Sequence, residues 1–436
     1  MEDNIIELKK KLEELPKGYI SVKRIGDGKY HYLQYFDGVK LKSEFISETR
    51  IKKIEEGIRK RRIITERIKK LEEKEKNLPN ISERAKNFSG NLMMEDRVVA
   101  VFENGETKYV DEQLCPLYIK RTHDLESFLA SRAIDQTRRN SRILKKVLGI
   151  SENNEAIISL YSHGACITDN YWFKAKGSKL KYKDIRFDSD CYSETALNGD
   201  ISYIYKKPKL TPHLTTPGSY EKSWKIRNGK WYLYKKGNED ELFSELFCSK
   251  LAALTGIPSA VYEMDDGVIR TENFAAKLNF EPLEGIAGDN DNFDHVFFVL
   301  NGLSAGIAKQ YLLLIWFDAI IKNVDRHNEN CGLLRDRNNG KIVSLAPNFD
   351  NNLALLSVDK VLDPDCRKDG FIKVYLNFVK NNETAAKYYK EMNLPVISRE
   401  MIRKCFAETP IKKDEKKIET FIINRYEYIS NCFRTL

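Results

Sequence analysis

The sequence predicts an α+β fold, in which strand-like and helical segments occupy separate regions of the chain. The first observation is an alternation of apolar and polar residues, typical of strands, over three neighbouring segments: 19–25, 30–35 and 40–46. The second is a strand pattern over 231–235, bounded by Asn-Gly and Gly-Asn pairs, that precedes a helical pattern over 241–254. The third is the predominance of helical patterns after residue 351, which are expected over 372–379, 385–392 and 414–433.

Length and composition indicate a soluble protein of several domains. A chain of 436 residues has room for two or three domains, and 42% hydrophobic residues are enough to form cores. No apolar run approaches the roughly 18 residues that span a bilayer, and the charged first residues do not resemble a secretory signal. We therefore expect a cytoplasmic protein without membrane contact. The eight cysteines form no Cys-x-x-Cys pair, which argues against a zinc site and a disulfide framework.

Residues 1–90 are expected to form a basic appendage of β-hairpins and one long helix. They hold 23 Lys and Arg against 16 Asp and Glu, so most of the net charge of +9 lies there. Turns are expected at 26–28 and 37–38, and a linker at 78–91. A helix expected over 47–77 has an apolar stripe, which favours packing on a neighbouring helix or a homodimer. Nucleic-acid contact through this basic segment is the alternative.

Residues 91–170 are expected to form a connecting α/β unit. A hairpin over 97–103 and 106–110 would turn at Asn104-Gly105. Helices are expected over 124–133 and 138–148. A basic cluster is expected on the exposed side of the second helix: Arg138, Arg139, Arg142, Lys145 and Lys146. The aromatic residues of 168–173 are expected to pin a strand or loop to a core.

The segment from residue 214 to residue 254 carries residue types suited to binding phosphate. Its loop, LTTPGSYEKSW over 214–224, is rich in Thr, Gly and Ser, so its backbone N–H groups could lie against phosphates. Lys235 ends the predicted strand, and Glu245 lies on the predicted helix that follows. A Lys and a Glu in this order are candidates for the ion pair with which kinases hold nucleotide phosphates. A strand and connector over 268–278 would lie beside the adenine.

A polar loop over 323–330 follows an apolar helical pattern over 311–321. Asp325 and Asn330 stand five residues apart, which is the spacing of the Asp and Asn in the kinase loop H-R-D-x-x-x-x-N. Asp350 follows after a hairpin-sized insertion, where a metal-binding Asp would fall. Asp325 would orient an attacking hydroxyl, while Asn330 and Asp350 would hold Mg²⁺. Turn chemistry alone is the alternative for this loop, but the order of all the segments favours phosphoryl transfer.

At these residues the chain resembles the HipA-like serine/threonine kinases, a bacterial toxin-kinase family. Residues 215–222, TTPGSYEK, match the family's Ser/Thr-x-x-Gly-x-x-x-Lys loop over the phosphates, and 346–350, APNFD, match its metal-binding segment. The resemblance implies a two-lobed kinase-like fold with an N-lobe over 171–280 and a helical C-lobe over 281–436. It also implies ATP and Mg²⁺ as cofactors, a protein substrate with a Ser or Thr acceptor, and a small antitoxin protein as partner.

The resemblance and the spacing together assign three groups of residues. The expected catalytic residues are Asp325 and His327, of which His327 assists electrostatically or braces the loop. The expected nucleotide-binding residues are Thr215, Gly218, Ser219, Lys222, Lys235 and Glu245. The expected metal ligands are Asn330 and Asp350.

Two features of the sequence keep other functions open. Members of the family often autophosphorylate a Ser at the position where this chain has Thr215, and Ser219 lies nearby. The resemblance therefore does not imply that this chain is regulated by autophosphorylation of the loop. The loop Asp325-Arg-His-x-x-Asn330 is also similar to the loop of phosphoinositide lipid kinases, so a lipid or small-molecule acceptor is an alternative. The remaining alternative is an inactive kinase fold that binds nucleic acid through residues 1–90.

Overall fold

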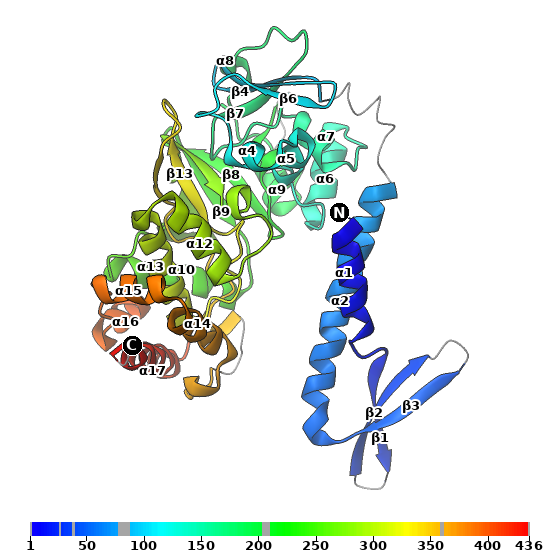
Figure 1. The fold of residues 1–436 in the computed structure, drawn as a ribbon, viewed down its shortest axis with the longest axis vertical. Coiled ribbons are helices and arrows are strands. Elements are labelled where there is room, and N and C mark those ends of the chain that lie inside the picture. The colour runs from blue at the N-terminus through cyan, green and yellow to red at the C-terminus, as the bar shows by residue number, and fades with distance from the viewer. Residues whose placement is uncertain are drawn as a thin grey trace. The chain divides into compact units, whose positions relative to one another are not determined.

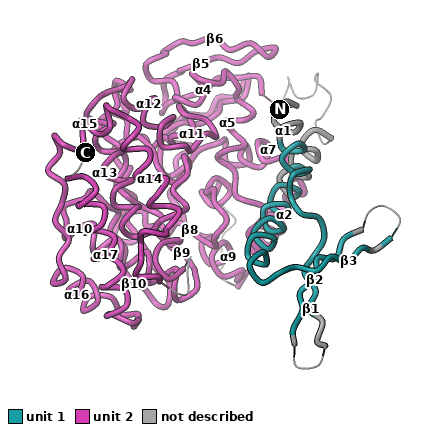
Figure 2. Tube along the Cα trace, turned by 60° about the horizontal axis from the view of Figure 1, so that its bottom comes forward, with its two compact units in different colours: residues 1–84 teal, residues 85–436 magenta. Residues whose placement is uncertain are grey.

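A computed structural model describes residues 2–25, 28–36, 40–76, 88–202, 210–357 and 362–434. The chain divides into two compact units, Met1–Arg84 and Ala85–Leu436 (Figure 2). Residues 26 and 27 of the turn expected at 26–28, the turn expected at 37–38, and most of the linker expected at 78–91 lie outside the described residues. The further division of 91–436 at residues 170 and 280 stays a prediction.

The first unit consists of a three-stranded antiparallel sheet, ordered β1-β2-β3, and two helices that pack on each other (Figure 1). Arg61 on the second helix donates hydrogen bonds to the carbonyls of Leu12 (2.5 Å) and Leu15 (2.9 Å), at the end of the first helix. The stripe predicted over 47–77 therefore belongs to a helix that has a packing partner within the chain. The strands expected over 19–25, 30–35 and 40–46 and the helix expected over 47–77 are confirmed as β1 (Tyr19–Ile25), β2 (Gly28–Phe36), β3 (Leu41–Ile46) and α2 (Glu48–Lys76), and helix α1 (Glu2–Glu13) precedes them.

The second unit begins with a four-stranded sheet, ordered β6-β5-β4-β7, and a group of short helices. The sequence did not predict β4, whose first residues fall in the expected linker. Strand β4 pairs with both β5 and the distant β7, and its Leu92 and Met94 are fully buried because they pack into the apolar core against this sheet. The strands are β4 (Gly90–Met94), β5 (Arg97–Glu103), β6 (Glu106–Tyr109) and β7 (Tyr171–Ala175). The helices are α4 (Leu117–Thr122), α5 (Leu125–Ser131), α6 (Arg139–Leu148), α7 (Glu155–Leu160), α8 (Tyr182–Ile185), α9 (Ser193–Asn198) and the 3₁₀ helix η1 (Pro212–Thr215).

A second four-stranded sheet, ordered β10-β11-β9-β8, lies beside helix α10. Asn238 caps α10 in a capping box with Glu241, which explains why the helix begins where it does. The elements are β8 (Lys222–Arg227), β9 (Lys230–Lys235), α10 (Glu239–Leu254), β10 (Tyr262–Asp265) and β11 (Val268–Glu272). The strand predicted over 231–235 and the helix over 241–254 are confirmed.

The rest of the second unit is mainly helical, with a three-stranded sheet ordered β12-β13-β14. Helix α13 is apolar on all sides and lies in the middle of the largest core of the described residues. The strands are β12 (Leu278–Pro282), β13 (Gly332–Asp336) and β14 (Ile342–Leu345). The helices are α11 (Glu284–Ala287), α12 (Phe293–Leu303), α13 (Ala305–Ile321), α14 (Gly370–Asn381), α15 (Glu383–Glu391), α16 (Arg399–Glu408), α17 (Glu415–Arg434) and the 3₁₀ helices η2 (Leu355–Ser357) and η3 (Cys366–Lys368).

The predicted α+β class is confirmed, with a sheet-rich part followed by a helix-rich part of the second unit (Figure 1). Among the described helices, none combines the length and the apolar character needed to cross a membrane.

Candidate active site

One cavity of about 370 Å³ in the second unit brings the predicted site residues together. Its walls come from the β8–β9–β11 side of the second sheet and from the loops around the end of α13. The predicted residues that line it are Thr215, Gly218, Ser219, Lys222, Lys235, Asp325, His327, Asn330 and Asp350. Glu245, the remaining predicted residue, is fully buried behind Lys235.

Lys235 is held between two carboxylates at the end of β9. Its Nζ lies 3.2 Å from Oε2 of Glu245 and 2.6 Å from Oδ1 of Asp350. Burial would lower the pKa of this lysine, but the two carboxylates outweigh burial and hold the pKa well above its ordinary value. Lys235 is therefore a permanent cation on the cavity wall.

Asp350 is presented to the cavity by a strained backbone. Its φ of 60° lies in the left-handed region, which Asp tolerates better than most residues. The N–H of Asn351 donates to Oε1 of Glu245 (2.9 Å), so Glu245 holds both Lys235 and the backbone next to Asp350. Burial would raise the pKa of Asp350, but Lys235 and Lys222 lower it to about 2. Asp350 is thus ionised and able to bind a cation.

The loop after α13 places Asp325 and Asn330 side by side. Nδ2 of Asn330 donates to the carbonyl of Asp325 (3.1 Å) and lies 3.4 Å from its Oδ2. Burial raises the pKa of Asp325, and the nearby Asp350 adds to this effect, while His327 opposes it. The backbone of His327 bonds to Asp325 and Asn330, and Nδ1 of its ring accepts from the N–H of Glu329 (3.3 Å). These contacts favour a bracing role for His327.

Arg326 is a structural centre of this loop that sequence reasoning did not single out. Its guanidinium contacts both carboxylate oxygens of Asp318 (2.9 and 3.1 Å) and the carbonyls of Asn330 and Phe349 (both 2.6 Å). It also donates to the side chain of Asn348 (2.7 Å), so it joins the Asp325 loop to the segment before Asp350. The available signal was Asp318, a charged residue within an otherwise apolar helical pattern.

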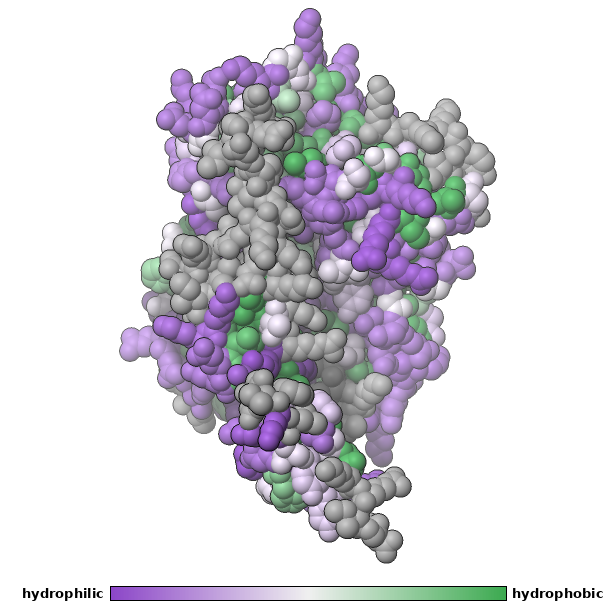
Figure 3. Space-filling model, turned by 90° about the vertical axis from the view of Figure 1, so that its right-hand side faces the viewer, coloured by the Kyte–Doolittle hydropathy of each residue, from purple (hydrophilic) through white to green (hydrophobic). Residues whose placement is uncertain are grey.

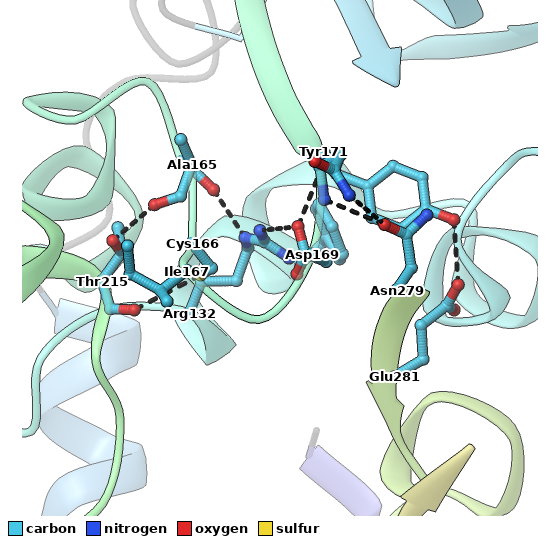
Figure 4. Close-up of polar contacts among 12 residues, drawn as sticks. Arg132, Ala165, Cys166, Ile167, Asp169, Tyr171, Thr215, Asn279 and Glu281 are labelled. Carbon is cyan, nitrogen blue, oxygen red and sulfur yellow. Dashed lines mark hydrogen bonds and ion pairs between the residues drawn. The ribbon is translucent and has the colours of Figure 1, made fainter. Parts of the chain in front are cut away.

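The loop over 215–222 is anchored by side chains that bond to backbone. Oγ1 of Thr215 donates to the carbonyl of Ala165 (2.5 Å), so this hydroxyl is engaged by the protein rather than by the cavity (Figure 4). Arg138 donates to the carbonyls of Thr216 (2.5 Å), Pro217 (2.6 Å) and Gly218 (2.5 Å). The expectation that the basic cluster of 138–146 is exposed is therefore wrong for Arg138.

The same correction applies to Lys145, which is buried beside the start of the next loop. Its Nζ donates to the side chains of Gln136 (3.0 Å) and Asn153 (3.1 Å) and to the carbonyl of Glu152 (3.0 Å). Arg138 is buried by a loop about 80 residues later in the chain, whereas Lys145 is buried by the residues that flank its own helix. Arg139, Arg142 and Lys146 are exposed, as expected.

Lys222 ends the 215–222 loop as a buried cation that faces the cavity. Within the described residues, no hydrogen bond or ion pair engages its ammonium group. Burial and the nearby Arg138 lower its pKa to about 7. Gly218 has a φ of 93°, and a side chain at this position would collide with Nζ of Lys222. The loop thus leaves one amine, which is a cation once protonated, ready for an anionic ligand, while Ser219 lies exposed at the cavity rim.

The donor set fits a magnesium ion that shares its coordination with phosphate. Among the described residues, no group of three or more His, Cys, Asp and Glu is placed to hold a metal. Asp350 and the amide oxygen of Asn330 are oxygen donors on the same cavity. Mg²⁺ is commonly bound by one or two protein oxygens together with water and substrate phosphates.

Paired polar side chains of the first and third sheets and of their neighbouring segments also line the cavity. Arg132 contacts Asp169 (2.7 Å), and the hydroxyl of Tyr171 donates to Glu281 (2.9 Å) on β12 (Figure 4). Arg335 also pairs with Glu281 (2.5 Å). These contacts join the first sheet of the second unit to the third and thereby close the cavity on this side.

Comparisons with known proteins match parts of this chain. The family model described as "Domain of unknown function (DUF6788)" matches residues 1–56. A solved structure of the Helicobacter pylori proinflammatory kinase CtkA is 18% identical, with a TM-score of 0.39, and the match covers 49% of this chain and 93% of that one. No curated protein matches.

A second solved structure is the Shewanella oneidensis MR-1 toxin–antitoxin complex of HipA, HipB and operator DNA. Its matching chain is 14% identical, with a TM-score of 0.47, and the match covers 79% of this chain and 97% of that one. At these identities and TM-scores, activity and partners are not transferred between proteins. The function is therefore inferred from the residues of this chain.

Proposed function

We propose that this protein is a kinase that transfers the γ-phosphoryl group of ATP, with Mg²⁺, to a Ser or Thr hydroxyl of a protein. The proposal rests on one observation. Lys235, paired with Glu245 and Asp350, lies on the same cavity as the adjacent Asp325 and Asn330. These are the charges that phosphoryl transfer requires, and little further covalent chemistry is needed from the protein.

Each residue has a role in the proposed reaction. Lys235 and Lys222 would bind the phosphates, and Asn330 and Asp350 would hold Mg²⁺. When bound, ATP supplies the phosphoryl group and Mg²⁺ neutralises its charge. Asp325 would orient the acceptor hydroxyl and take its proton, and the raised pKa of Asp325 makes it a better base than an ordinary carboxylate.

The loop over 215–222 would contribute through its backbone and through Lys222. The hydroxyl of Thr215 bonds to the carbonyl of Ala165, which supports an anchoring role for this side chain rather than direct phosphate contact. Gly218 and Ser219 would cover the phosphates. Arg138 would hold the loop in place through its carbonyl oxygens, leaving the N–H groups for the ligand.

The test is Mg²⁺-dependent transfer of labelled γ-phosphate to proteins of a cell lysate. The native chain is compared with Asp325→Asn, Asp350→Asn and the control Asp291→Asn, which alters an exposed Asp outside the cavity. We expect both site variants to lose transfer by orders of magnitude, because positioning and charge neutralisation supply most of the rate. The control should keep the native rate.

Other outcomes of this experiment would indicate a different function. Label on phosphoinositides or small molecules, but not on proteins, would identify a kinase with a different acceptor. Nucleotide binding without transfer would identify an inactive regulatory module. A chain that neither binds nucleotide nor transfers phosphate would overturn the proposal.

The resemblance to HipA-like kinases extends the proposal to a toxin that is paired with a small antitoxin protein. Production of the native chain in a bacterial host should then arrest growth, whereas the Asp350→Asn variant should not. Normal growth with an active kinase would remove the toxin role and leave the kinase proposal unaffected.

A further inference from the structure

The three-stranded sheet of the first unit has two very different faces. In antiparallel strands, residues directly opposite each other point to the same face. Tyr32 lies opposite both Ser21 and Phe45, and by the same register Tyr19 and Tyr30 share this face. The alternation places Leu33 and Ile46 on the other face, where both are buried.

The first of these faces carries aromatic rings at the protein surface. Tyr19 is 56% exposed, Tyr30 40% and Phe45 54%. The ring of Phe45 lies 6.4 Å from that of Tyr30 and 5.8 Å from that of Tyr32, so the rings form one group. We call Tyr19, Tyr30, Tyr32 and Phe45 the aromatic face. The exposed face of an antiparallel sheet normally carries polar residues, and exposed apolar groups often mark binding sites.

The rings of the aromatic face have defined neighbours on the sheet. Among the coloured residues on the side drawn in Figure 3, most are hydrophilic, and hydrophobic residues form small patches. Tyr19 also donates a hydrogen bond to the side chain of Gln34 (2.6 Å), which fixes the orientation of its ring on the sheet. The ring of Tyr19 is therefore held in place and not merely left uncovered.

The charge around the aromatic face is positive. Residues 1–84 hold 22 Lys and Arg against 16 Asp and Glu, a surplus of six positive charges. Exposed lysines lie beside the strand ends, at Lys17 and Lys40, whereas the register turns the exposed Lys29 and Lys42 towards the face of Leu33. The described positions of the face itself include no Asp or Glu. A second copy of the same positive unit would be repelled, whereas a polyanion would be attracted.

We propose that the aromatic face of the first unit binds single-stranded nucleic acid. Unpaired bases would stack on Tyr19, Tyr30, Tyr32 and Phe45, and the phosphates would meet the surrounding lysines. Exposed aromatic rings within a positive surface are the combination by which proteins hold single strands without reading their sequence. A duplex keeps its bases inside the helix and offers none to these rings. The site lies in a different unit from the proposed kinase cavity and does not depend on it.

The test measures binding of the full chain to a fluorescent single strand of about 20 nucleotides, as oligo(dT) and as oligo(U), by anisotropy at several salt concentrations. The variant Tyr19→Ala/Phe45→Ala removes the two most exposed rings of the face. The control Tyr161→Ala/Phe298→Ala removes the same residue types from exposed positions in the second unit, where the side chains are 46% and 77% exposed. Thermal unfolding checks that both variants are folded.

We expect the Tyr19→Ala/Phe45→Ala variant to bind at least tenfold more weakly, since each base stacked on a ring strengthens binding about five- to a hundredfold. The control should bind as the native chain does, and affinity should fall as salt rises. The Asp350→Asn variant should bind normally, which separates this proposal from the kinase proposal. A duplex of the same length should bind more weakly.

Four results would overturn the proposal. They are absence of binding at low salt, equal binding by the Tyr19→Ala/Phe45→Ala variant, stronger binding of the duplex, and a loss of dimerisation in that variant without an effect on nucleic acid. The last result, read by sedimentation, would assign the face to contact between copies. If Tyr19→Ala/Phe45→Ala does not fold, Tyr19→Ser and Phe45→Ser are tested singly, and unchanged binding in both overturns the proposal.

Discussion

The second unit contains two buried clusters, each made of oppositely charged side chains. They differ in whether their charged groups reach the cavity. The cluster of Arg326 and Asp318 is closed, because its guanidinium bonds to a carboxylate, to carbonyls and to amide side chains of the protein. The cluster of Lys235, Glu245 and Asp350 is open, because Lys235 and Asp350 line the cavity and the Asp350 side chain is 16% exposed.

The comparison separates positioning from binding. In the closed cluster all the interactions are internal, so it holds the Asp325 loop and the Asp350 segment at a defined distance. In the open cluster the Lys235 ammonium lies between two carboxylates, yet Lys235 and Asp350 line the cavity and remain accessible to a ligand. A site that must bind phosphate and metal therefore needs both kinds of cluster: one to set the geometry and one to bind the ligand.

The largest effect should come from breaking the open cluster with Lys235→Met. We expect transfer to slow by roughly a hundred- to a thousandfold, which is typical for loss of one charged contact to the reacting group. Single-turnover transfer and calorimetric nucleotide titration measure this loss. Lys236→Met is the matched control, because Lys236 is the exposed neighbour of Lys235 and should tolerate the change. Equal rates in both variants would contradict the assignment of Lys235.

We expect the variant Arg326→Met, which breaks the closed cluster, to be less stable than the native chain. This variant leaves Asp318 as a buried, unpaired carboxylate, so the free energy of unfolding should fall by about 3–5 kcal/mol. Urea unfolding measures the change. Arg367→Met, which breaks an exposed pair with Asp365, should change it by less than about 1 kcal/mol. Unchanged stability in Arg326→Met would contradict the structural role of the closed cluster.

His213 extends the comparison to a buried group without a partner. Within the described residues, neither ring nitrogen has a hydrogen-bond partner, and burial, with Arg138 and Lys225 nearby, lowers the pKa to about 3 from 6.5. The unfolded chain binds the proton more readily, so stability should fall as pH falls from 6.5 towards 3. Relative to His213→Leu, the native chain should lose about 3 kcal/mol between pH 7 and pH 4, at about 1.4 kcal/mol per pKa unit. Urea unfolding at each pH measures the difference, and parallel curves would contradict it.

The smallest effect should be the pH dependence of nucleotide binding through Lys222. In the free protein its pKa is about 7, because burial, Arg138 and Lys235 outweigh Asp350 and Glu245. A bound phosphate would raise this pKa, so binding takes up a proton and affinity should fall as pH rises from 7 to 9, by at most about tenfold per unit. Calorimetry in buffers of different ionisation enthalpy measures the uptake. Lys222→Arg should abolish it, since arginine stays protonated.

Local patterns in the sequence were sufficient to place most elements near the cavity. The strand that ends at Lys235 and the helix that carries Glu245 were predicted because alternation and periodicity are properties of short segments. The spacing of Asp325 and Asn330 likewise predicted that they would lie together, and their side chains are in contact. The ordered series of motifs predicted one cavity, and the same cavity contains nine of the ten predicted residues.

Contacts between distant segments could not be read in this way. The burial of Arg138 depends on carbonyls about 80 residues later in the chain, and the pairing of β4 depends on β7, which begins at Tyr171. The direction of the Thr215 hydroxyl depends on Ala165. None of these partners leaves a periodic signal in the neighbouring sequence.

By itself, the sequence determined the α+β class, the element types and the identity of the charged residues that meet at the cavity, because these follow from local periodicity and spacing. Only the tertiary structure decided which charged side chains are paired inside the protein and which are accessible from the cavity. It buried Arg138 and Arg326 against backbone carbonyls and left Lys222 without a partner among the described residues. It also exposed the rings of Tyr19, Tyr30 and Phe45 on one face of a sheet. The physical reason is that exposure and pairing depend on what packs against a residue, and that partner lies far away in the chain.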